Sequence, residues 1–143
     1  MITAEDLTLL RRAIGIATTA VTTGDDPYGS LLAGPHGEVL TEAHNTVRRD
    51  HDITACPELK LARWAARELD PDTAAPTTMD TSCQPCGMCS GAITRSGLGR
   101  VVYALSAEQW AQLNPGVDWP GVPADGPALC DEARIPIDRH PQP

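Results

Sequence analysis

Cysteines and a glutamate at two predicted helix starts form the clearest chemical pattern in the sequence. Cys56-Pro57-Glu58 opens one predicted helix, and thirty residues later Cys86 and Cys89 open another, with two residues between them. A helix N-terminus lowers the pKa of a thiol, and the thiolate is the form that binds a metal ion. Three thiolates on zinc leave one tetrahedral position open for water, which is the pattern of a catalytic site. Glu58 would then be able to reach that water and move its proton.

The same residues allow other interpretations at this stage. A closed structural zinc site would need a fourth protein ligand, for which the candidates are Cys83, Cys130 and His44. The spacing of Cys86 and Cys89 also occurs in redox-active dithiols. Glu58, taken alone, is typical of a first-turn carboxylate that the helix dipole favours. We expect Cys83 to be a small buried residue and Cys130 to have no part in the site.

Composition limits the classes of protein and of partner. The 143 residues are enough for one compact domain, and the apolar residues (41%) include no Phe, which predicts an aliphatic core. Five cysteines, an odd count, argue against a disulfide framework. A net charge of −8 argues against nucleic acid as a partner, because phosphate binding needs positive surface. No apolar run reaches the roughly 18 residues of a membrane span, and a signal-peptide pattern is missing, so we expect a cytoplasmic protein that binds no membrane.

Apolar periodicity and turn residues predict an α/β fold, a three-layer α/β/α sandwich made by a single domain over residues 1–143. Helices are predicted over residues 4–20, 57–69, 86–94 and 106–113. Strands are predicted over residues 28–33, 38–43, 77–81, 100–105 and, as a last strand, 133–138. They would form a central mixed five-stranded sheet with an opening hairpin, and strand–helix–strand segments would join parallel neighbours. We expect segment 44–54 to be an exposed loop and 114–143 to be an irregular C-terminal tail.

About half of the chain, from Leu31 to Tyr103, resembles the cytidine deaminase-like zinc superfamily. The resemblance is to its branch of guanine deaminases, yeast-type cytosine deaminases and tRNA adenosine deaminases. It is carried by His44-Asn45-Thr46-Val47, by Cys56-Pro57-Glu58, and by the block TSCQPCGMCSGAI, which runs from Thr81 to Ile93. The third block is the most specific, and it most resembles bacterial guanine deaminases.

This resemblance implies a site and a reaction as well as a fold. It makes Cys56, Cys86 and Cys89 zinc ligands, Glu58 the proton shuttle and Asn45 the residue that holds the substrate base. The implied reaction is hydrolytic deamination of a free nucleobase or small nucleoside, with a purine such as guanine slightly preferred over cytosine. Zinc-bound hydroxide would attack the amino-bearing ring carbon and ammonia would leave. The resemblance also implies a homodimer.

Two other functions stay open. The first is deamination of adenosine in tRNA, which the charge of −8 and the lack of a basic C-terminal segment disfavour. The second is a catalytically silent structural zinc protein. A test for ammonia release separates this second alternative from an enzyme, whereas a zinc assay does not.

The chain departs from the family pattern at several positions. Many relatives have His-Ala-Glu where this chain has Cys-Pro-Glu at 56–58, so its zinc site would be formally negative instead of neutral. We expect a weaker Lewis acid and an altered substrate range. Gln84 stands where relatives often have Glu, and the tail after Leu113 does not resemble their substrate-closing C-terminal helices.

The roles of three further residues stay open. Asn45 could bond its own backbone in a loop instead of holding a substrate. Trp110 and Trp119 could cover the site or pack against the tail.

Overall fold

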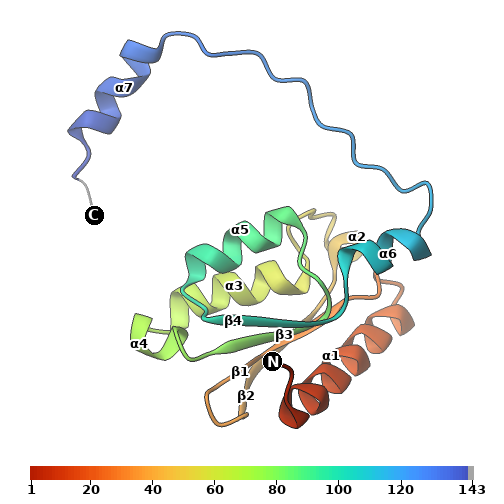
Figure 1. Cartoon of the computed structure of the whole chain (residues 1–143). Helices are drawn as coiled ribbons and strands as arrows, with labels where there is room; N and C mark the ends of the chain where they lie inside the picture. Colours follow the sequence, from red (N-terminus) through yellow and green to blue (C-terminus); the bar gives the residue numbers. More distant parts are fainter. Residues whose placement is uncertain (142–143) are drawn as a thin grey trace.

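The chain folds around a mixed four-stranded sheet that has helices on both faces, as Figure 1 shows. The structure is a computed structural model that describes residues 1–141. The strands are β1 (Gly29–Ala33), β2 (Val39–His44), β3 (Thr78–Cys83) and β4 (Arg100–Leu105). The helices are α1 (Ala4–Thr22), α2 (Val47–Asp50), α3 (Pro57–Glu68), α4 (Pro71–Ala74), α5 (Gly87–Ser96), α6 (Ala107–Leu113) and α7 (Cys130–Arg139).

The predicted helices form because their ends carry suitable capping residues. Thr3 and Asp6 make reciprocal side-chain and backbone hydrogen bonds at the start of α1, and Ser106 and Gln109 do the same at the start of α6. Helix α5 ends at Gly97, whose φ of 86° is one that glycine adopts at little cost. These caps satisfy backbone groups that a helix end leaves without partners. The predicted positions of α1, α3, α5 and α6 are confirmed to within about two residues.

The order of the strands is β2-β1-β3-β4. The predicted hairpin of β1 and β2 is confirmed, and so is the parallel pair of β3 and β4, which α5 connects. The expectation of parallel neighbours fails for β2–α3–β3, because β1 lies between these two strands and is antiparallel to both. The C-terminal ends of β2 and β3 therefore lie at the same edge of the sheet, on either side of the first residues of β1.

Successive side chains of a strand point to opposite faces of the sheet, so the protein has two separate cores. Leu32 and Met79 pack with Leu61 of α3 and Ile93 of α5 on one face. On the other face, Leu31 packs against α1 with Ala33 and Leu9. Both cores are aliphatic, as the lack of Phe predicts. The three layers of the predicted sandwich are therefore present, with α1 below the sheet and α3 and α5 above it in Figure 1.

The predicted fifth strand is wrong. Residues 133–138 lie in helix α7, so the sheet of the described chain has four strands. Ala133, Ile135 and Ile137 alternate as in a strand, but no strand of the sheet pairs with them. Within α7, Arg134 and Asp138 form an exposed ion pair one turn apart, with 2.9 Å between Nε and Oδ2, which adds a little to the stability of a helix that also contains Pro136.

The segment 44–54 is also more ordered than an exposed loop. It contains the short helix α2, and Asn45 and Thr46 are buried. Backbone hydrogen bonds tie these two residues to neighbouring segments, from Asn45 N to the Tyr28 carbonyl and from Thr46 N to the Ala55 carbonyl, both 3.0 Å. The segment therefore has a fixed position at the edge of the sheet where β2 ends.

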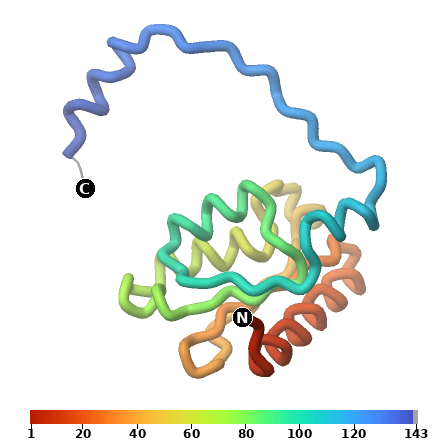
Figure 2. The backbone as a smooth tube through the Cα atoms, in the orientation of Figure 1, coloured from red at the N-terminus to blue at the C-terminus, as the bar shows by residue number. Residues whose placement is uncertain are grey.

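Residues 114–141 extend away from the body, as Figure 2 shows most clearly. Residues 114–129 form neither helix nor strand, which agrees with the predicted irregular tail. Trp119 lies in this part and is exposed, so it neither covers the site nor packs against the tail. Among residues 1–141, the helices are all too short or too polar to cross a membrane.

Candidate functional site

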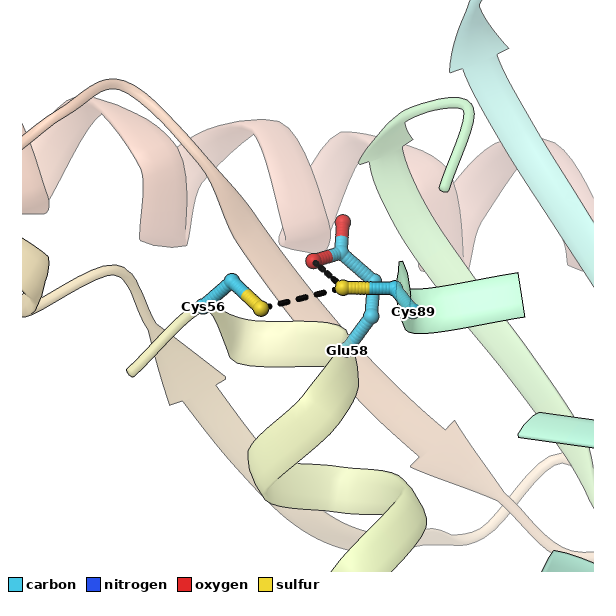
Figure 3. Close-up of side chains that lie close together, drawn as sticks. All are labelled: Cys56, Glu58 and Cys89. Atoms are coloured by element: carbon cyan, nitrogen blue, oxygen red, sulfur yellow. Dashed lines mark hydrogen bonds between the residues drawn. The ribbon is translucent and has the colours of Figure 1, made fainter. Parts of the chain in front are cut away.

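Helices α3 and α5 bring two cysteines and one glutamate together. Cys56 is the N-cap of α3, Glu58 lies in its first turn, and Cys89 lies in the first turn of α5. The sulfur atoms of Cys56 and Cys89 are 3.0 Å apart, and the Cys89 sulfur is 4.0 Å from Glu58 Oε2. Figure 3 shows these three side chains pointing toward one another. Their ligand atoms all lie within 4.8 Å of one another, as in a metal site.

The two helix starts meet because α3 and α5 pack side by side on the same face of the sheet. Pro57 occupies the first position of α3, where its missing N–H costs nothing and its fixed φ suits a helix. Cys56 and Cys86, the N-caps of α3 and α5, both have extended backbones and make no side-chain capping bonds. The sulfurs of both cysteines therefore stay available near the positive ends of the helix dipoles.

The hydrogen bond between the sulfurs changes the titration of both thiols. The Cys89 thiol stabilises the Cys56 thiolate by donating to it, and this lowers the pKa of Cys56 to about 7. The same bond, together with burial, raises the pKa of Cys89. Without a metal ion, Cys56 is therefore the first of the two thiols to lose its proton. Metal binding would then require the loss of the proton that Cys89 holds.

Glu58 is 6% exposed and hydrogen-bonded inside the protein. Thr81 Oγ1 donates to Glu58 Oε1 over 2.8 Å, and Ser30 Oγ donates to Thr81 Oγ1 over 2.7 Å. Burial raises the pKa of Glu58, and the hydrogen bonds to its carboxylate oppose part of that increase. The two hydroxyls come from paired positions on β1 and β3. The sheet therefore fixes the orientation of the carboxylate that α3 supplies.

The third predicted zinc ligand is not in the cluster. Cys86 is exposed and lies outside the group that Cys56, Glu58 and Cys89 form. The candidates for a fourth ligand lie outside this group too, because within residues 1–141 no group of metal-binding side chains includes Cys83, Cys130 or His44. Cys83 is buried, as predicted, and Cys130 is exposed on α7.

Asn45 lies where β2 ends and has one of its two amide functions occupied. Its Oδ1 accepts a hydrogen bond from Val47 N at 3.0 Å, which is the loop geometry that the sequence left open. Among the described residues, the Nδ2 group of Asn45 donates no hydrogen bond. The side chain therefore serves the loop through its oxygen and keeps its donor for another partner.

The structure adds a polar residue, Lys60, that the sequence did not single out. Lys60 Nζ donates to the His44 carbonyl and to Thr46 Oγ1, on either side of Asn45. Burial lowers the pKa of Lys60. In the sequence, its one signal is that it is the only lysine in the chain.

Helix α6 is attached to this edge of the sheet at two points. Trp110 Nε1 donates to the Tyr28 hydroxyl over 2.7 Å, and Ala107 N donates to Gln84 Oε1 over 2.9 Å. Burial raises the pKa of Tyr28, and the charges of Cys83 and Glu58 add to this effect. Gln84, which departs from the family pattern, thus holds the start of α6. Trp110 is thus bonded to Tyr28, the residue that precedes β1.

The donor set of the cluster fits zinc. Thiolate sulfur is a preferred ligand of zinc and a poor ligand of calcium or magnesium. The sulfurs of Cys56 and Cys89 lie close together. Beside them, the buried Glu58 carboxylate accepts a hydrogen bond from the Thr81 hydroxyl. A third thiol, Cys86, begins the same helix that carries Cys89.

Comparisons with known proteins agree with this assignment. A family model described as the cytidine and deoxycytidylate deaminase zinc-binding region matches residues 3–105. The guanine deaminase of Bacillus subtilis is 34% identical over 112 residues, which cover 78% of this chain and 70% of that protein. Its X-ray structure superposes with a TM-score of 0.73 and 28% identity, covering 92% of this chain and 90% of that one.

Two further relatives are longer than the region they share with this chain. The probable cytosine deaminase of Schizosaccharomyces pombe is 35% identical over 112 residues, which cover 76% of this chain and 65% of that protein. The tRNA(Ile)-lysidine synthase of Deinococcus deserti is 32% identical over 135 residues, which cover 90% of this chain but 25% of the synthase.

The fold, the Cys-Glu-Cys cluster and the match over residues 3–105 together define the class. The chain belongs to the cytidine and deoxycytidylate deaminase family and contains its zinc-binding region. Members named guanine deaminase, cytosine deaminase and tRNA-specific adenosine deaminase are among its relatives. These enzymes are hydrolases that act on carbon–nitrogen bonds.

Proposed function

We propose that this protein is a zinc-dependent hydrolytic deaminase of a free nucleobase or small nucleoside, with a purine such as guanine preferred. The observation that carries the proposal is the buried, hydrogen-bonded carboxylate of Glu58 beside the sulfurs of Cys56 and Cys89. A structural zinc site has no use for such a carboxylate. The likeness to a guanine deaminase over nearly the whole of both chains supports a purine base as substrate.

Cys56, Cys86 and Cys89 would hold the zinc ion, with the Cys86 side chain turning inward to join the other two sulfurs. Zinc supplies Lewis acidity, which makes water a better nucleophile at neutral pH. Glu58 takes a proton from the attacking water and delivers it to a ring nitrogen of the base. Glu58 then moves the remaining hydroxyl proton to the amino group, the bond between the ring carbon and that nitrogen breaks, and ammonia leaves as the ring carbonyl forms. Thr81 keeps the Glu58 carboxylate oriented through these transfers.

Asn45 would hold the base. Its Nδ2 group is available to donate to a ring nitrogen or carbonyl, while its Oδ1 keeps the loop in place through Val47 N. A donor fixed at the edge of the sheet where β2 ends would set which edge of the base faces Glu58.

A coupled assay for ammonia across a panel of bases and nucleosides tests the proposal. The zinc-loaded protein should release ammonia from at least one base, and a guanine-type purine should give the highest kcat/KM. The matched control is Glu58→Gln, which keeps the shape of the side chain but cannot carry the proton. If the parent releases no ammonia from any member of the panel, or as little as the control, the protein is not such a deaminase.

A second candidate function is deamination of adenosine in tRNA, because several relatives are named tRNA-specific adenosine deaminases. The net charge of −8 favours the small substrate, since RNA binding draws on positive surface. A tRNA substrate added to the same panel decides between the two. We also propose a homodimer by resemblance, which analytical ultracentrifugation of the full chain can test.

A further inference from the structure

The single lysine of the chain is bonded to both sides of the residue that would hold the base. Lys60 Nζ donates to the His44 carbonyl at 2.9 Å and to Thr46 Oγ1 at 2.6 Å. These two residues flank Asn45 in the sequence. Thr46 Oγ1 in turn donates to Asp50 Oδ2 over 2.6 Å. The segment from His44 to Thr46, called the Asn45 segment below, is therefore held by a side chain of α3 as well as by its own backbone hydrogen bonds.

Holding this ammonium group in place has costs, which the negative charges of Asp50 and Asp25 offset in part. Lys60 lies in the first turns of α3, where the helix dipole disfavours a positive charge. Its side chain is half-buried and held at both bonds, so it loses rotational freedom and part of its hydration. A lysine with no role beyond solubility would lie on the exposed face of the helix.

Helix α3 also carries Cys56 and Glu58, at its N-cap and in its first turn. The same short piece of helix therefore fixes a zinc ligand, the proton shuttle and, through Lys60, the segment that contains Asn45. A change in the orientation of α3 would move all three together. The spacing between Glu58 and Asn45 would thus be kept.

We propose that Lys60 is a positioning residue that fixes Asn45 relative to Glu58 and thereby sets the affinity of the site for its base. The proposal rests on the deaminase function proposed above. Within residues 1–141, the Lys60 ammonium group makes no hydrogen bond to Cys56, Glu58 or Cys89. Its loss should therefore weaken substrate binding more than zinc binding or proton transfer, even though the charge of Cys56 acts on Lys60.

The first test compares Lys60→Met with Lys60→Arg and with Arg63→Met in the zinc-loaded full chain. Arg63 lies exposed on the same helix, so its loss removes the same charge without touching the Asn45 segment. Lys60→Met should raise KM about tenfold with kcat changed less than about threefold, and Lys60→Arg should restore much of the affinity. Arg63→Met should behave as the parent, and zinc content should be equal in all four proteins. A KM of Lys60→Met within twofold of the parent, or a fall in kcat alone, overturns the positioning role.

The second test needs no substrate. The backbone amides of Asn45, Thr46 and Val47 are all hydrogen-bonded, so their hydrogen exchange reports how firmly the segment is held. Lys60→Met should speed their exchange about tenfold relative to the parent and to Arg63→Met, with the core of the sheet unaffected. Equal exchange in the three proteins overturns the role of Lys60.

The two tests separate the failure of this inference from the failure of the proposed function. If the parent deaminates no base, the proposed function fails, and the exchange rates still report whether Lys60 holds the segment. If the parent is active and Lys60→Met matches it in both tests, Lys60 has no positioning role and the deaminase function stands. Should Lys60→Met not fold, Thr46→Val removes one of the two contacts and should raise KM about threefold, and an unchanged KM there overturns the proposal.

Discussion

Two carboxylates lie buried on opposite faces of the same sheet, and their surroundings differ. Glu58, on the face of α3 and α5, receives a hydrogen bond from Thr81 and lies beside two cysteine sulfurs. Asp80 precedes Thr81 on β3 and points to the face that α1 covers. It is fully buried, and neither of its oxygen atoms has a hydrogen-bond partner in the described structure.

Arg100, the positive charge that acts on Asp80, already has a partner. Arg100 makes two hydrogen bonds to the Asp6 carboxylate, at 2.7 and 2.9 Å. Burial raises the pKa of Asp80 to about 6, and the charge of Asp6 adds to this more than Arg100 can offset. The pKa of Asp6, by contrast, is held far below its usual range by Arg100.

The comparison shows that burial of a carboxylate is not in itself a sign of function. Both groups have raised pKa values because both are buried. What sets Glu58 apart is a donor that orients it and thiols that face it. Asp80 has neither, so we expect Glu58 to control activity and Asp80 to control stability.

The largest expected effect comes from replacing the carboxylate that has partners. Glu58→Gln should lower kcat by roughly 10² to 10⁴, because a general acid–base group supplies about that factor and the amide cannot transfer the proton. Zinc content, measured by mass spectrometry of the metal, should not change. A variant that retains kcat within a few-fold of the parent would show that Glu58 is not the proton shuttle.

The next largest effect concerns the carboxylate without partners. The pKa of Asp80 is higher in the folded than in the unfolded state, so its contribution to stability is present at low pH and is lost as pH rises from about 4 to about 6. Asp80→Asn stays neutral and should be more stable than the parent by on the order of 2 kcal/mol at pH 7. Near pH 4 the two proteins should have similar stability.

Urea denaturation at pH 4, 5, 6 and 7 measures this difference, and activity serves as the control. The free energy of unfolding of the parent should fall relative to that of Asp80→Asn through this range, while kcat at pH 7 stays the same. A stability difference that does not depend on pH contradicts the assignment of a raised pKa to Asp80.

A smaller effect is expected at the substrate-binding position. Asn45→Asp keeps an oxygen for Val47 N but removes the Nδ2 donor. It should lower kcat/KM about tenfold, since a donor to the base is lost, with little change in melting temperature. Asn45→Ala should lower both quantities, because it also removes the loop bond. If Asn45→Asp keeps full catalytic efficiency, the side chain serves the loop alone.

The smallest effect should come from the hydroxyl that orients Glu58. Thr81→Val has nearly the same shape and removes the donor to Glu58 Oε1, a loss of about 1 kcal/mol or roughly fivefold in kcat. Thr81→Ser should restore the rate, because it restores the hydroxyl. Steady-state kinetics of the three proteins, at equal zinc content, measure this contribution. Equal kcat in Thr81→Val and the parent would mean that α3 orients the carboxylate unaided.

Much of the fold could be predicted from the sequence where local signals agree with one another. The helix starts at Thr3, Pro57 and Ser106 have capping residues or proline before a helical apolar period, so neighbouring residues decide them. The segment 133–138 lacks such agreement. Its alternation suits a strand, but a strand needs a neighbour in the sheet, and the ion pair of Arg134 with Asp138 needs only the helix itself.

The candidate site could be predicted in part for the same reason. Cys56, Glu58 and Cys89 converge because two helix starts carry them and α3 packs against α5. Cys86 is exposed although it begins the same helix as Cys89, and the spacing along the chain does not encode that difference. The roles of Thr81 and Lys60 depend on contacts between residues 14 to 23 positions apart, which no local pattern encodes.

The attachment of α6 has a consequence for how this kind of chain can evolve. Trp110 and Gln84 fasten α6 to the sheet. The cysteine and glutamate cluster and the elements that carry it all precede residue 114. The residues beyond that helix can change in length or be exchanged without disturbing the sheet. In Deinococcus deserti a related stretch lies within a tRNA(Ile)-lysidine synthase, of which this chain matches 25%. Fusion to another enzyme beyond α6 would leave the contacts of Trp110 and Gln84 in place.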